Sequence, residues 1–506
     1  MMKPRALEST ARPSAHDCVF EHGLDFTVDG RYVCWGRDNK KHPRTWGTAR
    51  KLYDTSLILF LDFFVTTTSS AGASAAAQAK DDYGIGRELS VFCFVTIFLL
   101  GQVLGTIIFP PWSESFGRKK LYILSSALSA ICCVIVGVVD SLAGTIVGRF
   151  FGGLLSAIPY TVGCGSVEDM FSSWPRTWVL LFWTVASNIG LSMGPIIGSH
   201  ITTALSWRWL FYIYAIALAI ITVLFCFIRE SRPSQILIKE VNHLRQKTGD
   251  HSLEALNHDH FPDMHTFVRT ALFRPVQLLF TEPLVIFTAL MNGFSFALLY
   301  LFTEALQLVY TALDFSDSQA SLPFLGLAVG FWFSIPCRLI DYRLFASLRR
   351  QNLPIKPESK LTGLAIGAPV FAVGLWWFAW TIPPKVAVHW MVPTASLVLV
   401  GFALNEFDTV LYVYLADSYL SYSASATAAV QFVRALLSGV FPLFTKQMFE
   451  GLGYNAAASV IAALGTAFVV VPVLFIIYGE RIRARSPFAK YSLELEEDLG
   501  KEGSAA

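Results

Sequence analysis

The chain has 506 residues, of which 54% are hydrophobic and 15% are charged, and its formal net charge at pH 7 is +2. A soluble core cannot enclose an apolar fraction of this size, so the composition indicates an integral membrane protein. The near-neutral charge, with no basic patch interleaved with aromatic residues, excludes a nucleic-acid-binding protein.

The first 50 residues are polar and contain no apolar run of signal-peptide length, which predicts a retained N-terminal tail. Residues 51–228 then hold six apolar runs of the length, about 20 residues, that crosses a bilayer as a helix. These runs lie near residues 52–72, 89–109, 121–139, 143–165, 177–203 and 209–228.

Residues 229–281 are polar and charged and predict a linker outside the bilayer. Five of the ten histidines lie in this linker: His243, His251, His258, His260 and His265. Their spacing matches no standard zinc pattern, so a solvated loop is favoured over a metal site.

A second set of six apolar runs occupies residues 282–478, near 283–306, 320–340, 361–381, 389–414, 424–445 and 455–478. The remaining residues, 479–506, form a tail that is acidic toward its end and carries no predicted chemistry. The sequence therefore predicts an all-α membrane protein with twelve transmembrane helices in two six-helix halves.

Basic residues are concentrated on one side of this topology. They precede span one and follow spans two, eight and twelve: Lys40, Lys41, Arg44, Arg50, Lys51, Arg118, Lys119, Lys120, Arg343, Arg349, Arg350, Lys356, Lys360, Arg481, Arg483 and Arg485. Loops on the opposite side hold only scattered cations such as Lys80, Arg87 and Lys385. By the positive-inside rule, both termini should be cytoplasmic.

Missing motifs disfavour several other classes of protein. The eight cysteines have no paired CxxC spacing, which predicts neither disulfides nor a metal site. The sequence has no GxxxxGK[ST] phosphate loop, so ATP-driven transport by this chain is not expected. It also offers no set of nucleophile, base and oxyanion-hole residues, so an enzyme is not expected.

The segment 187–199 places four helix-loosening residues inside the fifth apolar run: Gly190, Gly194, Pro195 and Gly198. Glycines four residues apart let two membrane helices approach closely, and a proline removes one backbone donor and kinks a span. The pattern favours a hinge or seal in a transporter. The alternative is a plain close-packing face.

The loop after the second run resembles a signature of the major facilitator superfamily, G-x-L-A-D-R-x-G-R-K. Gly117, Arg118 and Lys119 match this pattern, and Glu114 takes the position of the aspartate. Three positions depart from it: Pro110, Trp112 and Ser115. The resemblance implies that Glu114 engages a facing helix N-terminus and latches the two halves in one state.

Further matches extend the resemblance over about residues 45–490. Arg149 in GRFFGG fits the fourth-span arginine of the family, and residues 190–199 are similar to the fifth-span motif of drug:proton antiporters, G-x-x-x-G-P-x-x-G-G. The chain is similar to fungal twelve-span drug:proton antiporters, which implies the major facilitator fold and a proton gradient, with no cofactor, as the energy source. Glu168 and Asp169 are expected to join a gating network around Arg149.

Carboxylates inside the spans are the candidates for proton coupling, because charge is costly in a membrane. Asp62 lies about the middle of span one, which lines the central cavity in the family; the alternative is a structural hydrogen bond. Glu406 and Asp408 lie in the middle of span ten, and at a helical spacing of two their side chains point about 200° apart. One can then face the cavity while the other pairs elsewhere; the alternative is a merely structural pair.

Polar and aromatic side chains on the spans are the candidates for the substrate cavity: Thr66, Tyr160, Trp183, Asn292 and Asn405. For the aromatic residues the alternative is packing or an interfacial belt. Glu304 and Arg434 match subfamily positions and fit a scaffold role better than substrate contact.

These features predict a proton-coupled exporter of a small amphipathic organic compound, such as a drug, toxin or secondary metabolite. We expect a monomer in the plasma membrane whose partners are that compound, protons and the lipid bilayer. One alternative is uptake or exchange of a polar metabolite such as a polyamine or an organic acid. Another is a membrane sensor that does not transport.

Overall fold

The computed structural model describes residues 15–27, 31–36, 39–171, 173–250, 252–256, 273–351, 357–384, 388–419 and 422–490. Within these residues, twelve helical segments are long and apolar enough to cross a membrane. The predicted all-α class and the number of spans are confirmed.

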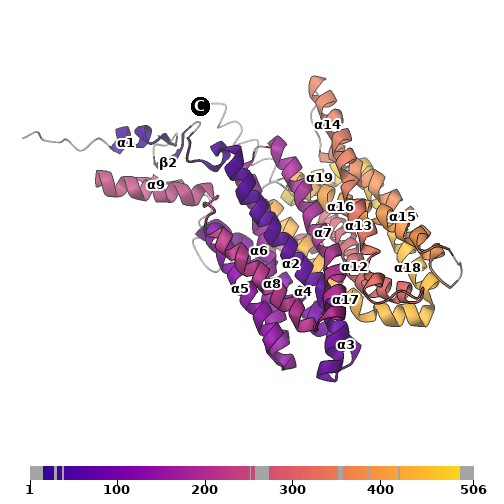
Figure 1. Cartoon of the computed structure of the whole chain (residues 1–506). Coiled ribbons are helices and arrows are strands. Elements are labelled where there is room, and N and C mark those ends of the chain that lie inside the picture. Colours follow the sequence, from indigo (N-terminus) through magenta and orange to yellow (C-terminus); the bar gives the residue numbers. More distant parts are fainter. Residues whose placement is uncertain are drawn as a thin grey trace, which may run out of the picture.

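The first six spans form one bundle (Figure 1). In chain order they are α2 (Thr48–Tyr83), α3 (Arg87–Val91) continued by the π-helical η2 (Phe92–Thr96) and α4 (Ile97–Phe116), α5 (Lys119–Val138), α6 (Leu142–Met170), α7 (Ser173–Ala204) and α8 (Trp207–Phe225). Within this bundle α2 packs on α7, α4 on α6 and α5 on α8.

The other six spans form the second bundle. They are α12 (Pro283–Thr311), α13 (Phe324–Trp332) continued by α14 (Ser334–Arg350), α15 (Thr362–Thr381), α16 (Met391–Tyr419), α17 (Ser423–Leu452) and α18 (Tyr454–Ala467) continued by α19 (Val470–Arg485). Three short helices flank these spans: α11 (Arg274–Thr281), η4 (Gln319–Ser321) and η5 (Pro357–Lys360). The two bundles meet chiefly where α4 contacts α17 and α7 contacts α13.

The largest difference from the predicted spans is at α2, which was expected to end near residue 72 and continues to Tyr83. Residues 71–79 read AGASAAAQA, so they are small rather than strongly apolar. The strongly apolar run therefore ends before these residues. The helix itself continues through them, because alanine is the strongest helix former.

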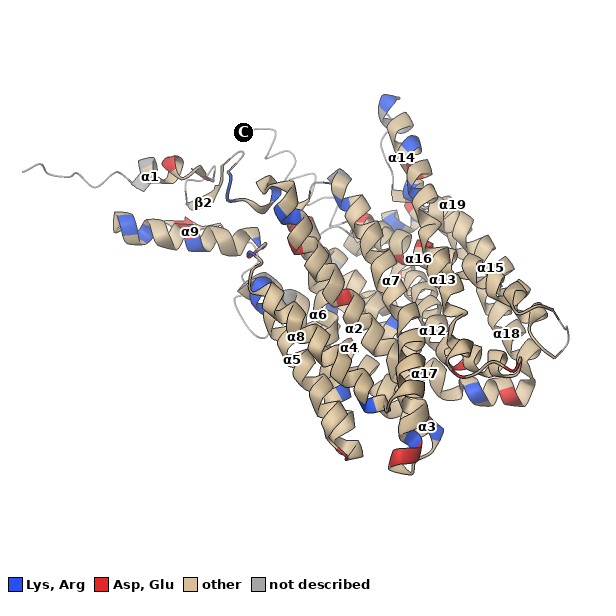
Figure 2. Ribbon diagram, in the orientation of Figure 1, with Lys and Arg blue, Asp and Glu red and all other residues tan. Residues whose placement is uncertain are grey.

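Side chains on the outside of the bundles fit a bilayer. On α8, four large apolar residues are 41–61% exposed: Ile213, Ile216, Ile220 and Val223. Charged residues gather toward the ends of the helices and are sparse along their middles (Figure 2). We call the end that carries the linker the linker end and the opposite end the far end.

Parts of the N-terminal tail and of the linker fold together into a small domain, which we call the clasp (residues 15–27, 31–36, 233–250 and 252–256). It consists of α1 (Ala15–Glu21), β1 (Leu24–Phe26), β2 (Tyr32–Trp35), α9 (Pro233–Thr248) and β3 (Glu254–Ala255) (Figure 1). Strand β2 pairs antiparallel with β1 and parallel with β3. The sequence predicted these segments as a separate tail and linker, whereas the structure packs them against each other.

The apolar face of α9 explains why the clasp forms. Leu237, Val241 and Leu244 recur at helical spacing and are buried against Val19 and Val33. Of the five linker histidines, His243 lies in α9 and the other four lie outside the described residues, as does the acidic end of the C-terminal tail.

Candidate functional site

The fifth-span glycines pack against a row of hydroxyl side chains on α2. Gly190 lies against Thr66, Gly194 against Ser70 and Gly198 against Ser74. A Cβ added at these glycines would lie 2.2, 1.9 and 2.9 Å from the facing hydroxyl oxygens, so only glycine fits this approach. We call this contact the glycine seam. It lies within one half and has the geometry of a close-packing face; the hinge remains a prediction.

Pro195 directly follows Gly194, inside the helix α7. Its carbonyl oxygen accepts a hydrogen bond from Ser74 Oγ at 3.5 Å. The hydroxyl of Thr66, in turn, donates to the main-chain oxygen of Asp62 at 2.8 Å. The seam therefore supports the turn of α2 that carries Asp62.

Asp62 is completely buried, and neither of its carboxylate oxygens makes a hydrogen bond to a described residue. Its polar neighbours on α7 are Trp183 and Ser187. The Trp183 indole nitrogen and the Ser187 hydroxyl are also without hydrogen bonds to described residues. Arg434 and Asp408, from the second half, lie close enough to act on Asp62 electrostatically.

Asp408 and Arg434 form the centre of a buried cluster that joins both halves. The Nη1 atom of Arg434 lies 3.6 Å from Asp408 Oδ1, and Asn292 Nδ2 donates to the same oxygen at 3.3 Å. Arg434 also donates to the Tyr160 hydroxyl of the first half at 2.5 Å. Its guanidinium stacks on the rings of Tyr160 and Phe296, 4.4 and 3.3 Å from their centroids.

Asn405 joins the two halves one turn away from this cluster. Its Oδ1 accepts a hydrogen bond from Asn188 Nδ2 at 3.0 Å, and its Nδ2 donates to Ser334 Oγ at 3.0 Å. Thr184 and Thr409 make a second link between α7 and α16, with 3.0 Å between their hydroxyl oxygens. Sequence analysis missed Thr184 and Asn188, although two polar residues four apart in an apolar span share one face of its helix.

A cavity between the halves lies beside this cluster. Its lining is mostly apolar or aromatic, with a few polar groups: Val65, Thr66, Ser69, Phe98, Leu99, Gln102, Leu191, Tyr300, Arg434, Ala435 and Ser438. A hydrogen bond of 2.6 Å between Ser69 Oγ and Tyr300 Oη crosses it from one half to the other.

Glu406 faces away from Asp408 and has different partners. It forms a buried ion pair with Arg338 of α14, which also binds Asp341 with Nη1 at 2.8 Å from Oδ2. A Cβ added at Gly363 would lie 1.9 Å from Glu406 Oε2, so α15 approaches this pair closely. The opposed directions of Glu406 and Asp408 agree with their spacing of two residues.

We expect Glu406→Gln to lower stability while proton coupling persists. The change leaves the charge of Arg338 buried with Asp341 as its remaining partner, and removing one member of a buried ion pair costs up to about 3–5 kcal/mol. Thermal unfolding in detergent measures the first effect, and transport under an imposed pH gradient measures the second. A stable variant that has lost its gradient dependence would instead make Glu406 a proton carrier.

At the linker end, the loop motif forms a network with the start of the linker. Gly117 has a φ of +90° and leads into α5. At the start of this helix, the main-chain N–H groups of Arg118 and Lys119 donate hydrogen bonds to the Glu230 carboxylate at 2.9 and 3.1 Å. A carboxylate at a helix N-terminus is stabilised by the helix dipole. The side chain of Glu114, to which the resemblance assigns this role, lies outside the described residues.

Asp169 belongs to this linker-end network. Arg118 Nε lies 2.8 Å and Arg232 Nη1 3.5 Å from its carboxylate oxygens. Glu168 instead forms a more exposed ion pair with Arg176, 3.5 Å apart.

Arg149 does not join that network, contrary to the expectation. It precedes Asp169 by 20 residues, which is roughly 30 Å along a helix at about 1.5 Å per residue. Its Nε donates to the main-chain oxygen of Phe94 at 2.7 Å, and its Nη atoms donate to those of Thr68 and Ser69 at 3.3 and 3.4 Å. Phe94 lies in the π-helical η2, a local widening of the kind that is often found at functional sites.

Comparison with known proteins identifies the family. The family model described as Major Facilitator Superfamily matches residues 55–442. The chain belongs to the major facilitator superfamily. It is a multi-pass membrane transporter and not an enzyme.

Relatives of this transporter include fungal efflux proteins. It is 31% identical to the multidrug transporter TPO1_2 of Candida glabrata, over 90% of this chain and 79% of that one. It is 32% identical to the efflux pump FUBT of Fusarium oxysporum, over 84% of this chain and 72% of that one.

A solved structure supports the fold assignment. The proton:xylose symporter XylE, bound to 6-bromo-6-deoxy-D-glucose, matches with a TM-score of 0.59 at 13% identity, over 85% of this chain and 97% of that one. At this identity the likeness shows the fold alone, with its two six-helix halves.

Proposed function

We propose that this transporter exports a small amphipathic organic compound by alternating access and couples export to proton entry. The observation that carries the proposal is Asp62, a buried carboxylate with no hydrogen bond to a described residue, beside the Asp408–Arg434 pair of the other half. Burying an ionised carboxylate away from water is costly, so a group in this position suits uptake and release of a proton as its hydration changes.

The proton on Asp62 controls an electrostatic link between the halves. When Asp62 is ionised, its charge attracts Arg434 across the interface, in competition with Asp408. When a proton binds, that attraction is lost and Arg434 stays with Asp408. Proton binding and release on one side chain thereby change the free energy of contact between the two halves, which alternating access requires.

The lining of the cavity suits an amphipathic substrate, but in this state it has room for about one water molecule, so the halves must separate before a substrate can enter. Phe98, Leu99 and Leu191 give it an apolar wall, and Ser69 and Tyr300 place a few hydroxyl groups within it. Apolar pockets with few polar groups are typical of sites for small organic molecules. The direction of transport rests on the fifth-span motif and on relatives whose names are multidrug transporter and efflux pump.

We place the linker end in the cytoplasm and the protein, as a monomer, in the plasma membrane. The orientation is supported by the basic residues of the linker end, among them Arg118 and Lys119.

Deletion of the gene followed by untargeted mass spectrometry tests the direction and the substrate together. Export predicts that one or more compounds accumulate inside cells that lack the transporter and fall in the medium. A polar metabolite, such as a polyamine, that stays unconsumed in the medium would support uptake and overturn export. Vesicles containing the purified transporter, with and without a pH gradient, then test coupling to protons.

A further inference from the structure

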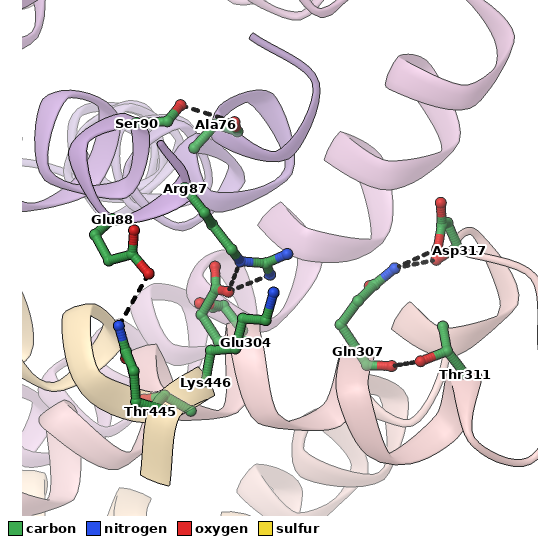
Figure 3. Close-up of polar contacts among 12 residues, drawn as sticks. Ala76, Arg87, Glu88, Ser90, Glu304, Gln307, Thr311, Asp317, Thr445 and Lys446 are labelled. Carbon is green, nitrogen blue, oxygen red and sulfur yellow. Dashed lines mark hydrogen bonds and ion pairs between the residues drawn. The ribbon is translucent and has the colours of Figure 1, made fainter. Parts of the chain in front are cut away.

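The two halves are joined at the far end by charged and polar side chains. Arg87, at the start of α3, forms an ion pair with Glu304 near the end of α12, with Nε donating to Glu304 Oε2 at 3.1 Å (Figure 3). Beside this pair, Glu88 Oε1 accepts a hydrogen bond from Gln447 Nε2 of α17 at 2.9 Å. Both contacts run from the first half to the second.

The Arg87–Glu304 pair is shielded from solvent on the glutamate side and half-buried on the arginine side. The Glu304 side chain is 4% exposed and that of Arg87 is 23% exposed. Surface ion pairs contribute little, but breaking a buried pair leaves a charge without compensation. The contact therefore holds the far ends of α3 and α12 together more firmly than an exposed pair would.

The linker end lacks an equivalent among fully described ion pairs. Of the pairs in which both side chains are described, only Arg87–Glu304 joins the two halves at either end. The described linker-end pairs stay within the first half and the linker, or within the second half; examples are Arg118–Asp169, Arg232–Asp169, Lys360–Asp417 and Arg483–Glu358. The far end therefore carries an ion pair that joins the two halves directly.

We propose that Arg87 and Glu304 form the far-end gate of this transporter. The two side chains separate when the central cavity opens to the far side, and their attraction sets the balance between far-end-closed and far-end-open states. This proposal rests on the proposed alternating access, in which the far side is the release side. It gives Glu304 a role beyond the scaffold role that the sequence favoured.

Distances between spin labels at the far end test the gate without substrate or protons. Labels attached to Asp81→Cys on α2 and Gly451→Cys on α17 report separation of the halves, since both positions are exposed. Replacing the exposed Cys226 by serine reduces background labelling. The matched control is Asp140→Asn, which breaks the Arg208–Asp140 ion pair within the first half, 2.8 Å long.

We expect Arg87→Gln and Glu304→Gln each to raise the population with the longer distance by roughly five-fold or more, the usual range for energetic coupling between sites. The exchanged pair Arg87→Glu with Glu304→Arg should return the distribution to that of the parent, and Asp140→Asn should not change it. Unchanged distances in monodisperse Arg87→Gln and Glu304→Gln would overturn the gate. So would a folded exchanged pair that stays shifted.

If Arg87→Gln fails to fold, Arg87→Lys provides the test, because lysine keeps the charge but loses the planar fork of arginine. A smaller shift to longer distances supports the gate, and no shift overturns it. Because the readout needs no transport, a shift together with failed export would count against the proposed function alone. Demonstrated export with no shift would count against the gate alone.

Discussion

Replacing Asp62 by asparagine is expected to abolish transport driven by a pH gradient while leaving the protein folded. Asparagine has nearly the shape of aspartate but cannot carry a proton at this site. The carboxylate makes no hydrogen bond to a described residue, so its loss should cost little stability. Solute accumulation in vesicles, with and without a gradient, measures the effect, and accumulation should fall to the level seen without a gradient.

Asp54→Asn is the matched control for this prediction. Asp54 lies on the same helix and is also buried, but it is near the linker end and pairs with Arg50 at 3.3 Å. This variant should keep its dependence on the gradient. Full gradient dependence in Asp62→Asn would remove Asp62 from the coupling mechanism.

Gly194→Ala is expected to be strongly destabilising. The added Cβ would lie 1.9 Å from Ser70 Oγ and 2.6 Å from the main-chain oxygen of Thr67. A side chain can rotate away, but the backbone of α2 cannot, so α7 must shift outward. Overpacking of this kind costs about 1–3 kcal/mol and occasionally more. The midpoint of thermal unfolding in detergent should fall accordingly.

Gly451→Ala provides the comparison, because it changes a helical glycine that has no atom within 4 Å of the added Cβ. Alanine favours a helix over glycine by about 0.8–1 kcal/mol, so this variant should be neutral or slightly more stable. Ser70→Gly should rescue Gly194→Ala only in part, because the contact with Thr67 remains. Equal midpoints for Gly194→Ala and the parent would contradict the seam.

The fold was largely predictable because each span is a separate apolar run. The directions of Glu406 and Asp408 were also predictable, since helix geometry alone separates two side chains at a spacing of two. Their partners were not predictable. Arg338 and Arg434 lie on other helices, and a single sequence does not say which faces of two helices meet.

Two features of the structure were not anticipated from the sequence, for different reasons. The separate contacts of Arg149 and Asp169 could have been foreseen, because the two residues share one helix whose rise alone places them far apart. The clasp was missed because β1 and β3 have three and two residues, too few for a periodic pattern. The apolar face of α9 could be recognised from its helical spacing, but the tail that covers this face lies about 200 residues earlier in the chain.

That separation along the chain gives the clasp a place in biosynthesis. The tail emerges first from the ribosome, yet α9 and β3 follow only after all six spans of the first half have been made. Until then Val19 and Val33 have no partners from α9 to cover them. The clasp can therefore be completed at about the moment when the first bundle is ready to assemble and the second has still to be translated, so its closure would mark the end of the first stage of assembly.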